Sequence, residues 1–316
     1  MSRPTLALCI PAYNAAIYLP RLLESALAQT IQFDEIWIYD DCSTDNTGEV
    51  ATNFGAKVIR GEVNRGCSHG KNVLAFHTTC KWIHFHDADD ALYPNFVEQA
   101  HKWMQLENKP DVVLFDYECR LHETDEVIGF RKFNDAQLRN DAISYSICEQ
   151  INPFCGLYYR AEFLQAGGYD TDPLILYNED VAFHCRLAIA GLKFAADPTV
   201  TVINYCRSNS MSSANQIKCC RAQFHVMRKV AEAVNGKYSA EIAQRLWQIS
   251  GVSAAQLDWE NADNCVDLAK SLSGKIPEEV STIFQIIGKW NPKYAIRLRE
   301  WSIRLLKPHL RKQFAK

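Results

Sequence analysis

The sequence predicts an α/β protein with a mostly parallel central sheet flanked by helices and with a helical C-terminal extension. Short apolar runs alternate with helical patterns through the first third of the chain. The runs are apolar at consecutive positions, which is typical of strands buried on both faces of a parallel sheet. Beyond about residue 215 the pattern is helical, without strand-like alternation. We therefore expect a boundary near residue 212 between a sheet domain and a helical region.

Four apolar runs predict the first four strands, and helical spacing predicts a helix after each of the first three. The strands are expected at residues 6–10, 36–39, 57–60 and 81–86. The helices are expected at residues 15–28, in a segment ending near Gly55, and at residues 68–79. Pro20 must lie in the first turn of the first helix, where its missing N–H costs little.

The next stretch of the chain is less regular. A helix at 95–106 leads to a strand at 111–115, and an edge strand at 127–133 precedes a helix at 136–147. A further helix, 181–190, follows Glu179 and Asp180 and is stopped by a glycine. The last predicted strand covers 199–205.

Composition limits the class of protein. The chain has 316 residues and is 47% hydrophobic, which is enough for one or two domains. The apolar run at residues 5–10 is too short for an export signal, and no run approaches the roughly 20 residues that span a bilayer. The twelve cysteines are scattered without a C-x-x-C pair, as expected of free thiols in a reducing compartment. These features predict a cytoplasmic protein.

Polar side chains follow three of the predicted strands at the point where each strand ends. The carboxyl ends of parallel strands meet at one edge of the sheet, where ligands bind. Asp87 and Asp89 lie two residues apart after the fourth strand, so they could share a hard divalent cation such as Mg²⁺ or Mn²⁺. A second Asp-x-Asp, at 170–172, lies in a turn-like context, so the pattern alone does not identify a metal site. The argument for Asp87 and Asp89 is their position directly after a predicted strand. The clusters are Pro11-Ala12-Tyr13-Asn14, Asp40-Asp41-Cys42-Ser43 and Asp87-Ala88-Asp89-Asp90.

Five short motifs follow one another in the first two thirds of the chain. They are Pro11-Ala12-Tyr13-Asn14, Asp40 to Asp45, Asn64-Arg65-Gly66 with Lys71-Asn72, Asp87 to Asp90, and Glu179-Asp180. In this order they resemble the motifs P-x-Y-N, D-D-x-S-T-D, N-x-G with R-N, D-x-D-D and E-D of the family 2 glycosyltransferases of the GT-A type. The resemblance covers about residues 4–212.

The resemblance implies a domain organisation. Residues 1–212 would form a GT-A glycosyltransferase domain, with a nucleotide-sugar-binding half at about 1–100 and an acceptor-side half at about 101–212. Residues 213–316 would form a C-terminal helical region with a basic amphipathic tail.

The resemblance also implies an activity and a set of site residues. The activity is inverting transfer of a hexosyl or N-acetylhexosaminyl group from a nucleotide-diphosphate sugar, expected to be UDP-linked, to a glycan or a lipid-linked acceptor in polysaccharide or glycoconjugate synthesis. Asp89 would ligate a divalent metal, Mn²⁺ or Mg²⁺, close to Asp87. Asp180 would be the catalytic base, with Glu179 beside it on the acceptor side. The nucleotide sugar would be bound by Pro11, Ala12, Tyr13, Asn14, Asp41, Gly66, Lys71, Asp87, Ala88 and Arg207.

Two positions depart from the family pattern. Lys71 stands where the family usually has Arg. The positive charge is kept, but the planar guanidinium that can donate two parallel hydrogen bonds is lost. Arg207 begins the run Arg207-Ser208-Asn209-Ser210-Met211-Ser212, where relatives often read H-x-x-S-x-S and use the His near the metal. Arginine cannot ligate a metal, but it can hold phosphate, so we expect Arg207 to contact the donor.

Two other functions remain open. His84 and His86 point to the same face of their strand, so with Asp87 and Asp89 they could form the metal site of a phosphoester hydrolase; two hydrogen-bonded histidines inside a covered sheet are the plainer interpretation. The third possibility is a nucleotide-sugar-binding protein without turnover. A transferase needs an acceptor and a hydrolase needs only water, so product analysis separates them.

Ordinary structural roles also remain open for the candidate acids. Asp41 could cap the turn that follows it, and Glu179 with Asp180 could stabilise a helix N-terminus through the helix dipole.

The C-terminal tail is strongly basic. Residues 289–316 hold nine basic residues and one acid, while the whole chain has a net charge of −3, so the rest of the chain is acidic and does not resemble a nucleic-acid binder. Tyr294, Leu298, Trp301 and Leu305 fall on one helical stripe. The tail could lie on an anionic membrane, as a peripheral contact near a lipid-linked acceptor, or dock on the sheet domain with its charges solvated.

Overall fold

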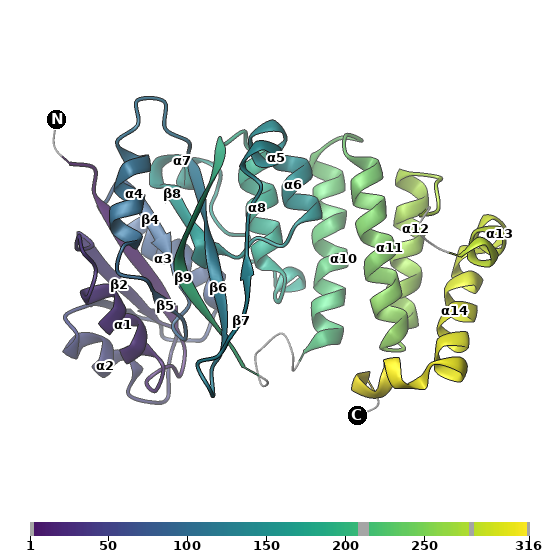
Figure 1. Ribbon diagram of the computed structural model, residues 1–316, viewed down its shortest axis with the longest axis horizontal. Coiled ribbons are helices and arrows are strands. Elements are labelled where there is room, and N and C mark those ends of the chain that lie inside the picture. The colour runs from purple at the N-terminus through teal and green to yellow at the C-terminus, as the bar shows by residue number, and fades with distance from the viewer. Residues whose placement is uncertain (1–2, 208–214, 278–280, 315–316) are drawn as a thin grey trace. The chain divides into compact units, whose positions relative to one another are not determined.

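The structure is a computed structural model that describes residues 3–207, 215–277 and 281–314 (Figure 1). The chain forms two compact units. The first contains residues 1–146, 150–171 and 183–210, and the second contains residues 147–149, 172–182 and 211–316. The sheet and most of the residues of its covering helices lie in the first unit.

One mostly parallel sheet dominates the first unit, which confirms the predicted fold class. Its order is β3-β2-β1-β4-β8-β6-β9-β5, with β7 paired to β6. Strands β1 to β4 are mutually parallel, as are β6 and β9, whereas β8 is antiparallel to both β4 and β6. The strands are β1 (Leu6–Ala12), β2 (Glu35–Asp40), β3 (Lys57–Arg60), β4 (Trp82–Phe85), β5 (Ala91–Leu92), β6 (Val112–Leu121), β7 (Val127–Arg131), β8 (Gly156–Tyr159) and β9 (Phe194–Cys206).

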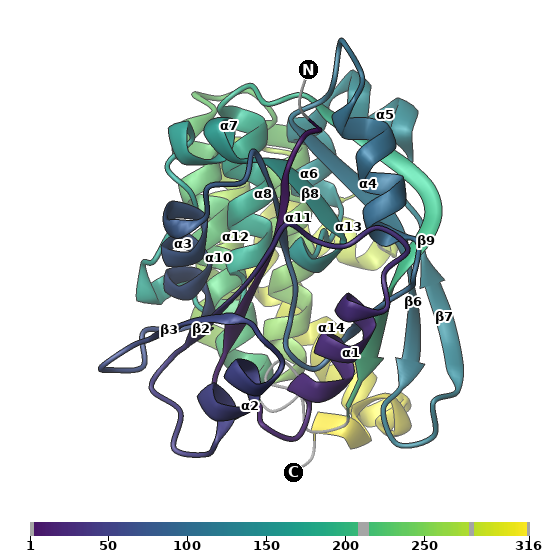
Figure 2. The same cartoon turned by 90° about the vertical axis from the view of Figure 1, so that its left-hand side faces the viewer.

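Eight α-helices accompany this sheet in the described part of the chain. Figure 2 shows α1 and α3 on opposite sides of the N-terminal strands. The strand order explains this, because the chain moves outward from β1 to β3 and then crosses back to β4 on the other side of β1. The helices are α1 (Leu19–Leu27), α2 (Thr47–Asn53), α3 (Cys67–His77), α4 (Phe96–Met104), α5 (Asp135–Asn140), α6 (Ala142–Cys148), α7 (Arg160–Gln165) and α8 (Glu179–Ile189).

The start of one predicted helix and the continuity of another differ from the expectation, and local hydrogen bonds account for both differences. The first helix begins at Leu19 and not at Ala15, because the Ala15 N–H donates to the Thr47 hydroxyl at 2.8 Å and holds the preceding segment against α2. Pro20 lies in the first turn, as predicted. The helix expected at 136–147 is two helices, because Asp141 ends α5 in an extended conformation and its side chain accepts the N–H of Ser144 in α6.

The core is built from β1 and the helices that pack on it. Leu6 to Ile10 are completely buried. Helix α3 approaches β1 and β2 closely at Gly70, where an added Cβ would lie 2.8 Å from the Tyr39 ring and 3.2 Å from the Pro11 Cβ. Glycine therefore lets α3 lie directly against the carboxyl ends of both strands.

The second unit is helical in its described residues, apart from short 3₁₀ segments. Helix α14 packs against α11 and α12, burying Ala295 and Ile296. Among the residues that the structure describes, no helix is both long enough and apolar enough to cross a bilayer. The α-helices that follow the sheet are α10 (Gln216–Ala233), α11 (Ser239–Ala255), α12 (Trp259–Leu272), α13 (Thr282–Trp290) and α14 (Pro292–Leu306).

Candidate active site at the strand ends

The three polar clusters lie at one edge of the sheet. β1 pairs with β2 as far as Ala12 and Asp40, and with β4 as far as Cys9 and Phe85. The N–H of Asp41 then donates to the Ala12 carbonyl at 2.8 Å, and the N–H of His86 donates to the Cys9 carbonyl at 3.1 Å. The edge also lies where the strand order reverses, between β1 and β4, which is the position of ligand sites in open α/β sheets.

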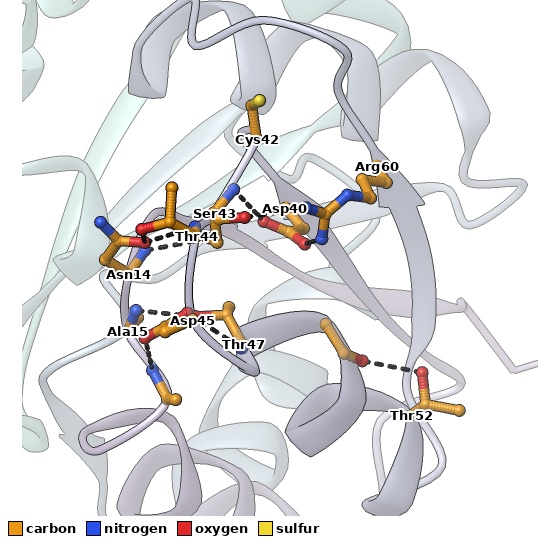
Figure 3. A network of polar contacts seen from close by, with 12 residues as sticks. Asn14, Ala15, Asp40, Cys42, Ser43, Thr44, Asp45, Thr47, Thr52 and Arg60 are labelled. Carbon is orange, nitrogen blue, oxygen red and sulfur yellow. Dashed lines mark hydrogen bonds and ion pairs between the residues drawn. The ribbon is translucent and has the colours of Figure 1, made fainter.

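Hydrogen bonds join the segment after β1 to the segment after β2 (Figure 3). The Asn14 N–H donates to the Ser43 hydroxyl at 3.0 Å, and the Asn14 side-chain oxygen accepts the N–H of Thr44 at 2.8 Å. Asn14 has φ 49°, the left-handed region that asparagine tolerates. Pro11 and Ala12 are buried, whereas the Tyr13 side chain is 51% exposed. These contacts fix the segment that carries the exposed Tyr13 side chain at the ends of β1 and β2.

Asp41 shapes the loop that leads into α3. Its buried carboxylate accepts the N–H of Arg65 at 2.8 Å and the N–H of Gly66 at 2.7 Å. Gly66 has φ 83°, which favours glycine, and it is the N-cap of α3. Asp41 therefore has a structural role, but on the loop at 64–66 and not in the turn that follows it, where Asp40 accepts the N–H of Ser43 at 2.9 Å. A nucleobase would share the Asp41 carboxylate with two backbone donors.

Lys71 is a buried cation that faces Asp87 of the loop after β4. Its side chain is 3% exposed, and its Nζ lies 3.6 Å from Oδ1 of Asp87 and 5.3 Å from the centre of the Tyr169 ring. A buried ammonium is costly without a counter-charge. Asp87 supplies that charge, and Ala88 occupies the turn between Asp87 and Asp89.

Asp89 forms an ion pair with Arg207 at the end of β9. The guanidinium carbon of Arg207 also lies 4.3 Å from the centre of the Tyr18 ring. Burial raises the pKa of Asp89, the neighbouring Asp87 raises it further, and Arg207 acts in the opposite direction. The predicted metal ligand therefore has a guanidinium as its partner. The rest of the run that begins at Arg207, Ser208 to Ser212, lies outside the described residues.

Asp90 anchors the loop to the sheet. Its buried carboxylate accepts the N–H of Tyr205 at 2.7 Å and the side-chain amide of Asn204 at 3.0 Å. Burial and the neighbouring Asp89 and Asp87 hold the pKa of Asp90 well above its usual range. Sequence reasoning did not separate Asp90 from the other acids of the motif, and it gave no role to Asn204 or Tyr18.

Asp87 and Asp89 fit a divalent metal that is shared with a diphosphate. Carboxylate oxygens are the ligands that Mg²⁺ and Mn²⁺ prefer, and Mg²⁺ usually takes only one or two of them together with substrate phosphates and water. Within the described ranges no group of three or more His, Cys, Asp or Glu side chains could hold a metal without such help. The donor set is thus suited to a metal that binds with its substrate.

The two histidines next to the motif are part of the buried sheet. His84 Nδ1 lies 2.8 Å from the Gly156 carbonyl, and His84 Nε2 lies 2.9 Å from His86 Nδ1. The carbonyl can only accept, so His84 carries its proton on Nδ1 and accepts from His86 with Nε2. Burial lowers the pKa of both side chains, that of His86 to about 3. His84 therefore has no lone pair left for a metal, which argues against the hydrolase site.

Glu179 and Asp180 form the first turn of α8. Glu179 is buried and Asp180 is half-buried. One turn later, Phe183 stacks on Tyr169 with ring centres 3.9 Å apart. Tyr177, just before the helix, has φ 77°. Because the structure divides between Ala182 and Phe183, these two acids belong to the second unit and the strand-end clusters belong to the first.

Comparison with known proteins identifies a related family. Residues 7–160 match the sequence profile described as "Glycosyl transferase family 2". An uncharacterized glycosyltransferase of Rickettsia prowazekii (strain Madrid E) is 34% identical over 117 residues, which are 36% of this chain and 37% of that protein. The match therefore covers little more than a third of this relative.

Solved structures share the fold over nearly the whole chain. Staphylococcus aureus TarS in complex with UDP-GlcNAc has a TM-score of 0.71 at 19% identity, covering 95% of this chain and 92% of that one. The mannosyltransferase PcManGT of Pyrobaculum calidifontis, in complex with GDP-Man and Mn²⁺, has a TM-score of 0.58 at 15% identity, covering 99% and 86%. At these identities the likeness concerns the fold, including the helical C-terminal part.

Proposed function

We propose that this chain, which belongs to glycosyl transferase family 2, transfers a sugar from a nucleotide-diphosphate sugar to a hydroxyl group of an acceptor. The family membership rests on residues 7–160. The observation that carries the proposal is the meeting of three polar strand ends, with Asp87 and Asp89, at the point where the strand order reverses. Similarly folded proteins bind UDP-GlcNAc or GDP-Man. The donor that we propose is a UDP-linked hexose or N-acetylhexosamine, of the kind bound by TarS.

The donor lies along the strand ends. Tyr13 and Asn14, with Pro11 and Ala12 beneath them, border the nucleotide, and Asp41 and Gly66 lie at its base. Asp87 and Asp89 would hold Mn²⁺ or Mg²⁺. Lys71 and Arg207 provide positive charge for the diphosphate. When bound, the metal would neutralise the charge that develops on the departing diphosphate.

Transfer inverts the anomeric carbon. The acceptor oxygen forms a bond to that carbon as the bond to the donor diphosphate breaks, and the nucleoside diphosphate leaves with the bonding electron pair. Asp180 takes the proton from the acceptor hydroxyl, and Glu179 supports the acceptor. A carboxylate in the first turn of α8 is suited to this because the helix fixes its direction.

The acceptor is a glycan or a lipid-linked saccharide, so the chain would act at the cytoplasmic face of a membrane in polysaccharide or glycoconjugate synthesis.

Helix α14 supports peripheral contact with that membrane. The side chains of Trp301 and Leu305 are 64% and 63% exposed, and Trp290, at the end of α13, is 83% exposed. Interfacial helices present such aromatic and aliphatic residues beside lysines and arginines. Lys293 and Arg297 instead pair with Asp267 and Asp263 of α12, so part of the basic charge holds α14 in place.

A donor-binding screen followed by product analysis tests the proposal. Isothermal titration of the full chain with UDP- and GDP-linked sugars, with and without Mn²⁺, should show metal-dependent binding of a UDP-sugar. Asp89→Asn should weaken that binding, whereas Glu107→Gln, an exposed acid in a turn, should not. Donor consumption should then require an acceptor. Consumption with water alone would indicate a hydrolase, and binding without consumption would indicate a non-catalytic protein.

A further inference from the structure

Arg207 occupies the place of a cation at Asp89. Its guanidinium donates to the Asp89 carboxylate and packs over the Tyr18 ring, so it is held on two sides. Only about a quarter of each of the two charged side chains is exposed. Asp89 is also the carboxylate proposed above as a metal ligand. The Asp89 carboxylate that would ligate the metal is thus already paired with the guanidinium of Arg207.

The acids of this loop need such partners. Asp87, Asp89 and Asp90 lie within four consecutive residues, and like charges this close repel one another strongly when partly desolvated. Asp90 is satisfied by Asn204 and the Tyr205 N–H, and Asp87 faces Lys71 at 3.6 Å. Asp89 has the guanidinium of Arg207.

We propose that Arg207 is an internal counter-ion that competes with the divalent metal for Asp89 and so makes metal binding depend on the donor diphosphate. This rests on the proposed function. A metal arriving alone must displace the guanidinium and leave it without an anion. A metal arriving with a nucleoside diphosphate gains phosphate oxygens as ligands, and the released guanidinium gains the same diphosphate as its new partner. In this scheme Arg207 couples the binding of the metal to the binding of the diphosphate.

Direct measurement of Mn²⁺ binding tests this without turnover. The electron paramagnetic resonance signal of free Mn²⁺ gives its affinity for the full chain, first alone and then with saturating UDP. Wild-type protein should bind Mn²⁺ weakly alone and much more tightly with UDP. Arg207→Ala should bind Mn²⁺ alone roughly tenfold more tightly, because the competitor is gone, and UDP should enhance its binding less. The Mn²⁺ affinity of Arg207→Lys should fall between those of wild type and Arg207→Ala, since lysine keeps the positive charge and loses the bidentate guanidinium.

The controls separate this inference from the proposed function. Arg139→Ala removes an exposed arginine paired with Asp135 on α5, and its Mn²⁺ affinity should equal that of wild type. Unchanged or weaker Mn²⁺ binding by folded Arg207→Ala overturns the inference and leaves the transferase intact. If that variant does not fold, unchanged binding by Arg207→Lys overturns it. A chain that binds neither UDP nor Mn²⁺ in any variant overturns the proposed function as well.

Discussion

At the scale of single residues, the acids of the site have different surroundings although they look alike in the sequence. Asp41 accepts two backbone N–H groups, Asp89 faces a guanidinium, and Asp90 is bound to β9. Asp180 lies in the first turn of a helix. Substituting each acid by its amide should therefore have a different consequence.

Asp180→Asn should lower the turnover number by about 10²–10⁴-fold, the usual contribution of a general base. Donor affinity should stay within a factor of about two, because the proton is taken from the acceptor. Transfer rates at saturating donor, together with donor titration, measure both quantities. Glu107→Gln provides the control. An unchanged turnover number would remove Asp180 from the mechanism.

Asp41→Asn should destabilise the protein by about 1–3 kcal/mol, the cost of leaving a buried donor unsatisfied. The amide offers one acceptor oxygen, so only one of the N–H groups of Arg65 and Gly66 keeps its partner. Urea denaturation monitored by circular dichroism measures the change in unfolding free energy. If Asp41 served the nucleobase alone, stability would be unaffected and only UDP binding would weaken.

At the scale of elements, Glu35 ties the start of β2 to its neighbours. It accepts the hydroxyl of Thr78 before β4 and the ammonium of Lys57 in β3, at 2.9 Å for the latter. Burial alone would raise the pKa of Glu35, but these bonds and that from Trp37 outweigh it and lower the pKa to about 2. The folded state therefore favours the carboxylate.

The low pKa of Glu35 predicts a pH dependence of stability. The unfolded chain protonates Glu35 near its usual 4.5, so the stabilisation is complete above that pH and is lost as the pH falls toward 2. Wild type should lose about 1–2 kcal/mol relative to Glu35→Gln over this range, a value reduced for partial solvent screening. Urea titrations at a series of pH values measure it. Parallel curves for the two proteins would contradict the assignment.

At the scale of the whole molecule, the exposed side of α13 and α14 should bring the chain to an anionic membrane. Vesicles rich in phosphatidylglycerol should pellet the protein at low salt, and added salt should release it. The double variant Trp301→Ala/Leu305→Ala should bind these vesicles less, while its transfer to a soluble acceptor stays unchanged. Phe76→Ala, which removes an exposed aromatic residue of α3, is the matched control. Absence of binding to anionic vesicles at low salt would end this proposal.

The order of most strands and helices was predictable because it depends on residues close together in the chain. The strands at 6–10 and 36–39 and the helical region after residue 215 all occur where apolar periodicity placed them. Strands β5 and β8 were missed. They are two and four residues long, and β8 lies in a stretch that read as irregular. Such short strands are defined by their partners in the sheet and not by their own pattern.

The sequence by itself determined most of the alternation of strands and helices, the polar residues after β1 and the acids after β2 and β4, because all of these depend on side-chain chemistry within a few residues. Only the tertiary structure decided what those acids face. Arg207 lies 118 residues from Asp89 along the chain. Gly156, whose carbonyl accepts the hydrogen bond from His84, lies 72 residues from that histidine. Contacts over such separations arise from the pairing of β4 with β8 and of β5 with β9, which no local pattern specifies.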